Sequence, residues 1–85
     1  MYISLKIDVV EQVCEVAGVG DTRSECEAMV TREPDLYFRT FDLSRKSDQV
    51  AKDIVDWFRG LGIPRRTACE LGVGLFKALE AGAQE

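Results

Sequence analysis

The residues best suited to binding a charged ligand lie at a turn in the second half of the chain. Arg65, Arg66 and Thr67 follow residues 60–64, whose glycines and proline are typical of one helix ending and another beginning. Free backbone amides at a helix start attract anions such as phosphate. The two arginines place positive charge at the unfavourable end of the helix dipole, which favours an anionic partner for this corner.

The residue types in this sequence give little support for catalysis or for metal binding. The chain has no histidine to act as a general base. It also lacks a glycine-rich phosphate loop and a nucleophile motif. Cys14, Cys26 and Cys69 are too widely spaced for a paired-thiolate metal site. We therefore expect no enzyme activity, no cofactor and no metal, and we interpret the cysteines as reduced thiols of a cytoplasmic protein.

Charge is distributed unevenly along the 85 residues, whose net charge is −4. Residues 1–37 contain three basic and eight acidic side chains, whereas residues 38–85 contain eight basic and seven acidic ones. This balance argues against general affinity for nucleic acid, because neutralisation of phosphates dominates that affinity. The same balance is compatible with a local basic strip on one face. No run approaches the roughly 20 apolar residues of a membrane span, and the amino terminus lacks the pattern of a secretory signal.

The first elements are predicted from apolar periodicity. Residues 2–7 alternate between apolar and polar side chains, as in a half-buried strand. Asp8 and Glu11 then have the spacing of a capping box, and the apolar residues of segment 9–17 recur at helical spacing. We therefore expect a helix over residues 9–17 that ends at Gly18.

A short helix and a second strand are expected next. Ser24 and Glu27 offer another capping box, which predicts a helix over about residues 25–32. Pro34 stops it, because a residue before proline avoids helical geometry. Residues 36–43 are rich in aromatic and other strand-favouring residues, with apolar side chains on both faces, so we expect a strand that is partly covered on both sides or carries a bulge.

Two longer helices complete the chain. Residues 50–61 show the clearest helical apolar face, and three residues compete for its N-cap: Ser44, Ser47 and Asp48. Pro64 suits the first position of the last helix, where its missing amide costs nothing. Gly72 and Gly74 inside that helix suggest either a close approach of another helix or a marginal helix that tolerates them.

The predicted fold is α+β and mainly helical, with two strands and four helices in the order βααβαα. A two-stranded element would pack on a helical layer within a single domain of residues 1–85, built from a first strand-helix-helix unit (1–33) and a second one (36–82). The strands pair either within one chain or between two chains. We expect a homodimer that associates through the last two helices.

This repeated order resembles the ribbon-helix-helix family of DNA-binding proteins. Residues 3–8 look like the ribbon, residues 22–26 look like the start of the second helix, and residues 62–67 are similar to that start. The resemblance implies a dimeric repressor or antitoxin-type regulator that binds duplex DNA with a paired ribbon in the major groove. It makes Ser4, Lys6 and Arg39 candidate base readers. It makes the following residues candidate phosphate contacts: Thr22, Arg23, Ser24, Arg65, Arg66 and Thr67.

An alternative interpretation starts from the acidic first half of the chain. Glu11, Glu15, Glu25 and Glu27 would face a basic protein partner, including one that normally holds nucleic acid, because complementary charge speeds encounter and sets orientation. The protein would then be a small inhibitor or accessory protein of phage or plasmid type. The same pattern is also explained by an acidic face that is exposed to solvent and binds no partner.

Overall fold

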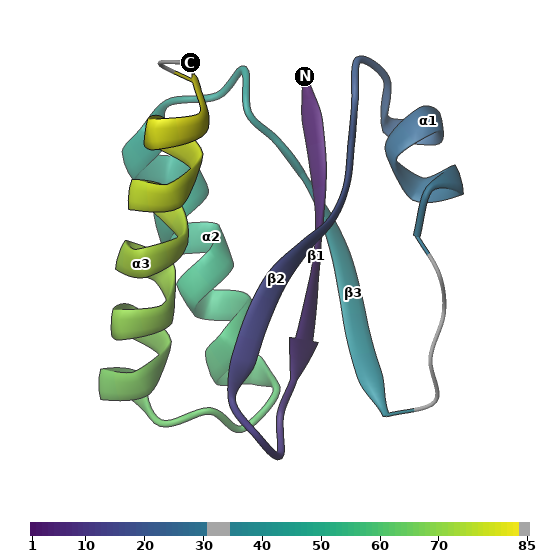
Figure 1. The fold of residues 1–85 in the computed structure, drawn as a ribbon. Helices are drawn as coiled ribbons and strands as arrows, with labels where there is room; N and C mark the ends of the chain where they lie inside the picture. Colours follow the sequence, from purple (N-terminus) through teal and green to yellow (C-terminus); the bar gives the residue numbers. More distant parts are fainter. Residues whose placement is uncertain (31–34, 84–85) are drawn as a thin grey trace.

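A three-stranded antiparallel sheet forms the centre of the molecule (Figure 1). The computed structural model describes residues 1–30 and 35–83, with side chains described as far as residue 79. The strands are β1 (Tyr2–Asp8), β2 (Val13–Gly20) and β3 (Leu36–Asp42), and their order across the sheet is β2-β1-β3. The first strand in the sequence is therefore the central one.

The predicted fold class is wrong in its element count and order. The described residues contain three strands and three helices in the order ββαβαα, so the chain does not repeat a strand-helix-helix unit. Residues 9–17, predicted as a helix, form a turn and the first part of β2. Valine is frequent in this segment, and a β-branched side chain is restricted in a helix but packs well on a pleated sheet.

The turn between β1 and β2 explains why its sequence looks like a helix start. The Asp8 carboxylate accepts hydrogen bonds from the amides of Val10 and Glu11, at 2.9 and 3.1 Å, as it would at an N-cap. The amide of Gln12 instead closes the turn on the Asp8 carbonyl at 2.8 Å. Gln12 has a φ of 58°, which reverses the chain into the hairpin.

The two strands predicted from sequence pair within one chain. β1 and β3 are antiparallel, with Tyr2 opposite Asp42 and Asp8 opposite Leu36. β2 occupies the other side of β1, with Tyr2 opposite Gly20 and a bulge that leaves Ala17 without a partner. Since β1 has a neighbour on each side, it is not available as a ribbon for a second chain.

The short helix α1 (Arg23–Ala28) covers one face of the sheet. Its capping box uses Thr22 and Glu25, not the predicted Ser24 and Glu27: the Thr22 hydroxyl accepts from the Glu25 amide, and the Glu25 carboxylate accepts from the Thr22 amide, each at 3.1 Å. The helix therefore starts earlier than predicted. Residues 31–34, which include the predicted helix end and Pro34, lie outside the described residues.

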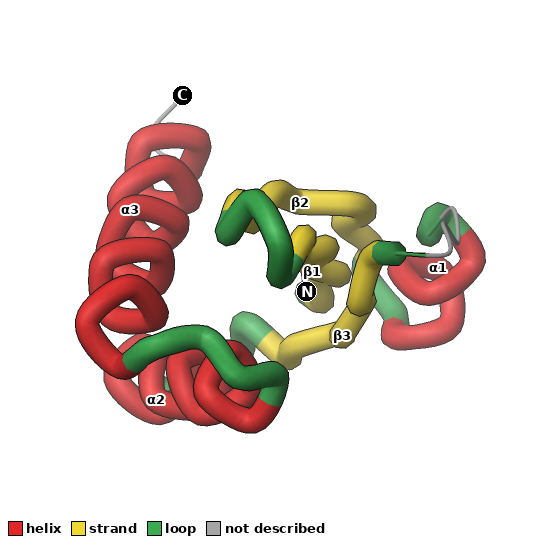
Figure 2. The backbone as a smooth tube through the Cα atoms, turned by 90° about the horizontal axis from the view of Figure 1, so that it is seen from below, coloured by secondary structure: helices red, strands yellow, loops and turns green. Residues whose placement is uncertain are grey.

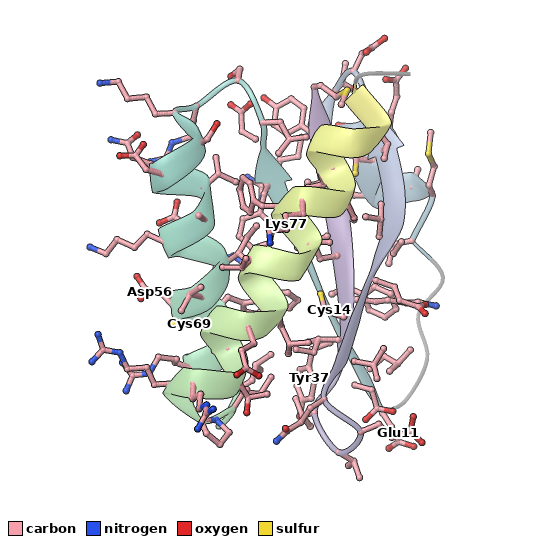
Figure 3. All side chains as sticks on the ribbon, turned by 60° about the vertical axis from the view of Figure 1, so that its left-hand side comes forward. Glu11, Cys14, Tyr37, Asp56, Cys69 and Lys77 are labelled. Atoms are coloured by element: carbon pink, nitrogen blue, oxygen red, sulfur yellow. The ribbon has the colours of Figure 1, made fainter. Side chains whose placement is uncertain are left out.

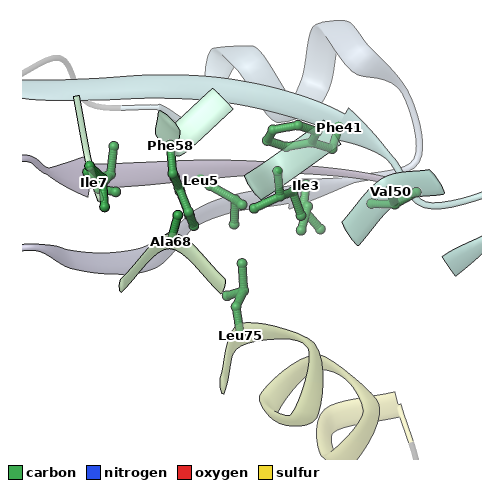
Figure 4. Close-up of a cluster of buried hydrophobic side chains, with 10 residues drawn as sticks. Ile3, Leu5, Ile7, Phe41, Val50, Phe58, Ala68 and Leu75 are labelled. Atoms are coloured by element: carbon green, nitrogen blue, oxygen red, sulfur yellow. The ribbon is translucent and has the colours of Figure 1, made fainter. Parts of the chain in front are cut away.

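The helices α2 (Ser47–Gly60) and α3 (Arg65–Ala83) lie together on the opposite face of the sheet (Figures 1 and 2). None of the three predicted residues caps α2; its N-cap is Lys46, without a side-chain hydrogen bond. The core lies between these helices and the sheet (Figure 4). Its fully buried members are Ile3, Leu5, Ile7, Ile54, Phe58 and Ala68.

The corner between α2 and α3 is compact, as its glycines and proline predicted. Gly62 has a φ of 93°, a conformation that favours glycine. The amide of Ile63 then returns to the Phe58 carbonyl at 3.2 Å, and its side chain joins the core. Pro64 accepts the first helical hydrogen bond of α3 from Ala68 at 2.9 Å, so the proline lies one residue before the helix.

Candidate interaction surfaces

Ser4 and Lys6, the candidate base readers of β1, lie on the face of the sheet that α1 covers. Ser4 is fully buried: its Oγ lies 2.6 Å from Oγ1 of Thr40, and the Cys26 thiol donates to it at 3.3 Å. Lys6 is partly buried, and its Nζ lies 3.4 Å from Oε2 of Glu15. The Ser4 hydroxyl is therefore buried between α1 and the sheet, where a DNA base cannot reach it.

Arg39, the candidate reader of β3, lies on the other face. It pairs with Leu5, and residues opposite each other in a sheet point to the same side. Its guanidinium carbon is 5.4 Å from the centroid of the Phe41 ring, a cation–π arrangement at the rim of the core. The three candidate base readers are thus not gathered on one surface.

The first group of candidate phosphate contacts is engaged in the start of α1. Thr22 is the N-cap, and Nε of Arg23 lies 2.8 Å from Oε1 of Glu27. The hydrogen bond and the charge of Glu27 together raise the pKa of Arg23 above its ordinary value. Ser24 is exposed. An anionic ligand would therefore have to displace the Glu27 carboxylate from the Arg23 guanidinium.

The second group lies at the start of α3 and is more open. Arg65 and Arg66 are exposed, and Thr67 is half-buried. Arg59, in the last turn of α2, is also exposed and lies just across the four-residue turn. Of these arginines, only Arg66 has an ion pair among the described residues, with Glu70 at 3.4 Å. We name Arg59, Arg65 and Arg66 the arginine corner.

The four candidate partner-binding glutamates have different environments. Glu11 lies in the exposed hairpin turn, as Figure 3 shows, whereas Glu15 pairs with Lys6 on β2. Glu27 pairs with Arg23, and the Glu25 carboxylate accepts from the amides of α1's cap. Glu11 and Glu15 therefore belong to the β1–β2 hairpin, while Glu25 and Glu27 belong to α1.

The exposed valines of β2 were not predicted, and they lie on both faces of the strand: Val16 and Val19 are opposite Leu5 and Ile3 on the core side, whereas Val13 is opposite Asp8 on the other side. Val13, Val16 and Val19 are 46%, 40% and 42% exposed, and Val10 in the adjoining turn is 84% exposed. Among the described residues β2 pairs only with β1, so its outer backbone groups face away from the sheet. We call these four valines and the free side of the strand the β2 edge. Unpaired edges with exposed apolar side chains are where other strands add.

The cysteines differ in how accessible they are. Cys14 points toward the core, and burial, together with the nearby Glu15 carboxylate, raises the pKa of its thiol to about 12. Cys26 is buried and donates to Ser4 and to the Gly18 carbonyl. Cys69 is exposed on α3. Cys14 and Cys26 are thus packing groups, and Cys69 is the accessible thiol.

Residues 1–30 and 35–83 hold no group of acidic, cysteine or histidine side chains that would bind a metal ion. No helix in the same part of the chain is long and apolar enough to cross a membrane. Comparison with protein-family models, with curated proteins and with solved structures found no significant match to this chain.

Proposed function

We propose that this protein is a protein-interaction module that takes up an extended segment of a partner along the β2 edge. The observation that supports the proposal is the combination of an edge strand that has one neighbour among the described residues and valines that are 40% to 84% exposed on the strand and its turn. Added strands gain affinity from main-chain hydrogen bonds and specificity from alternate side chains.

Charge around the β2 edge defines the chemistry of the partner. The two charged side chains of residues 9–20, Glu11 and Glu15, are both acidic. Glu15 lies on the strand itself and Glu11 on its turn. A basic segment with alternating apolar residues would therefore complement the strand, which agrees with an inhibitor or accessory protein that acts on a basic partner. The bulge at Ala17 and the charge of Glu15 limit indiscriminate pairing of the edge.

Selection from a library of displayed peptides tests this proposal. We expect the selected peptides to alternate apolar residues with lysine or arginine and to slow amide exchange in residues 13–20. Val13→Lys and Glu11→Lys are each expected to weaken these peptides by roughly tenfold, because each places a positive charge on a surface that binds a basic segment.

Asp56→Lys is the control matched to Glu11→Lys, since it also replaces an acidic side chain with a lysine, but on the outer side of α2, away from β2 (Figure 3). We expect it to leave peptide affinity unchanged. Protection of α2 or α3 amides instead of β2 amides would contradict the proposal, as would equal affinity of the two β2-edge variants and wild type.

A second candidate function is the binding of duplex DNA, which the resemblance to ribbon-helix-helix regulators implies. The arginine corner supports it: three exposed guanidinium groups flank one turn, and Arg66 alone is ion-paired among the described residues. In this fold the corner would contact phosphates while base contacts would have to come from elsewhere, since Ser4 is buried.

Electrophoretic mobility shifts with short duplexes at several salt concentrations test the second candidate. Arg65→Ala is expected to weaken binding to all sequences and to reduce the salt dependence by about one ion, as loss of one phosphate contact requires. Arg45→Ala is the control, because Arg45 is already bound to Asp53 at 2.9 Å on another part of the molecule. Identical salt slopes for wild type and Arg65→Ala would exclude the corner as a phosphate site.

A further inference from the structure

An apolar groove of about 280 Å³ lies where α2 and α3 meet, on a different surface from the β2 edge. The residues that line it are Ala51, Val55, Cys69, Gly72, Val73, Phe76 and Lys77. Figure 3 shows Cys69 and Lys77 at this junction of the helices. Val73 is 55% exposed, so an apolar side chain in the middle of the groove has no cover within the described residues.

The outward face of α3 combines this apolar strip with two opposite charges. Cys69, Val73 and Phe76 are spaced four and three residues apart, which puts them on one stripe of a helix. Glu70 and Lys77 each follow a member of that stripe by one residue, so both lie on the same flank. The acidic residue is toward the start of α3 and the basic one toward its end.

We propose that the partner for this face is a second copy of the chain, with its α3 antiparallel to the first. A two-fold axis near the middle of α3 brings Glu70 opposite Lys77 of the second copy. The same operation repeats that pair with the two copies exchanged, as every contact across a two-fold axis is repeated. Between the two ion pairs, Val73 packs against Phe76 of the second copy, again twice.

Charge self-complementarity is what selects a second copy in this orientation. A parallel arrangement would place the flanks that carry Glu70 and Lys77 on opposite sides of the seam between the two helices, so neither ion pair would form. Within one chain Glu70 already accepts from Arg66 at 3.4 Å, so in the dimer its carboxylate would lie between two cations. The apolar strip on α3 consists of only Cys69, Val73 and Phe76, so we expect a reversible, concentration-dependent dimer.

Charge reversal tests the orientation directly. Glu70→Lys gives a face with two positive charges, and Lys77→Glu gives one with two negative charges. Each variant alone is expected to dimerise about tenfold or more weakly than wild type, since both ion pairs become repulsive. A mixture of the two variants is expected to form a heterodimer, because every contact then joins opposite charges. Sedimentation velocity over a range of concentrations measures all of these species.

Two controls keep the test independent of folding. Both charge positions are exposed, so the circular dichroism spectrum of each variant at low concentration is expected to match that of wild type, and loss of the exposed Arg66–Glu70 pair is expected to lower the melting temperature of Glu70→Lys only slightly. Val73→Glu is expected to abolish the dimer by placing charge in the apolar strip. A monomeric wild type at all concentrations would overturn the proposal. So would a dimer that neither single reversal weakens, or a mixture in which the two variants do not recombine.

Discussion

Replacing Phe58 with alanine is expected to lower the free energy of unfolding by about 3–5 kcal/mol. The Phe58 ring is fully buried in the cluster between the sheet and the α2–α3 pair, near Leu5 and Ala68 (Figure 4). Truncation removes its apolar area from the core and leaves a cavity, because neighbouring elements relax only partly. Since small domains have a total stability of about 5–15 kcal/mol, this variant is expected to be close to unfolding. Urea denaturation followed by circular dichroism measures the change.

Phe38→Ala provides a matched control, because the same atoms are removed from the other face of the sheet. Phe38 pairs with Lys6 and is only half-buried, on the side that the short α1 covers. We expect its loss to cost less than half as much as the loss of Phe58, since less apolar area leaves water on folding. Equal destabilisation by the two substitutions would contradict the placement of the main core between β1 and the long helices.

The elements that were predicted correctly are those whose periodicity has one interpretation. Residues 2–7 alternate strictly, and they form β1 with its apolar side in the core. Residues 36–43 lack glycine and proline and contain three aromatic side chains, and β3 covers almost the same span. In residues 50–61 the apolar positions recur every three or four residues, which only a helix can bury on one side.

The error over residues 9–17 has a physical cause in two ambiguous signals. Asp8 satisfies two free amides whether a helix or a tight turn follows, so its presence does not distinguish them. The hairpin turn also lacks the Asn-Gly or Asp-Gly pair that usually marks a hairpin. The left-handed conformation falls on Gln12 instead. Whether a helix or a hairpin forms depends on β1, because the free side of β1 offers residues 13–20 a ladder of hydrogen bonds.

Gly18, predicted to end a helix, makes room for α1 instead, and so does Gly20. A methyl group at Gly20 would lie 3.0 Å from the amide nitrogen of Cys26, and one at Gly18 would lie 3.0 Å from Cβ of Met29. These close approaches join residues that are brought together only after β2 pairs with β1. A local pattern cannot express them, since they depend on tertiary packing.

For the candidate sites too, the sequence predicts what depends on local geometry and not what depends on tertiary packing. Arg65 and Arg66 are exposed as predicted, because their position beside Pro64 depends only on local helix geometry. Ser4 is a polar residue on the outer face of an alternating strand, and its burial required a third strand and α1. The β2 edge was not predicted, because Val10, Val13 and Val16 also fit the apolar face of a helix over residues 9–17. Burial of these residues depends on the neighbours of the strand.

Gly74→Ala is expected to raise the free energy of unfolding by about 1 kcal/mol, through the better helix propensity of alanine. Gly74 is exposed in the interior of α3, and an added methyl group would meet no atom within 4 Å. For a domain of this size, such a gain corresponds to an increase in melting temperature of about 4–8 °C. Differential scanning calorimetry at low protein concentration measures it without interference from self-association.

Gly72→Ala makes the same chemical change two residues away, and we expect the opposite sign. Its methyl group would lie 3.0 Å from Cγ2 of Val55 on α2. A valine in a helix has one strongly preferred rotamer, so the conflict is relieved mainly by moving α2 and α3 apart. Overpacking of this kind costs about 1–3 kcal/mol, which offsets or exceeds the gain in propensity. A Gly72→Ala variant as stable as Gly74→Ala would show that the two helices do not depend on this close contact, and that both glycines are merely tolerated in a marginal helix.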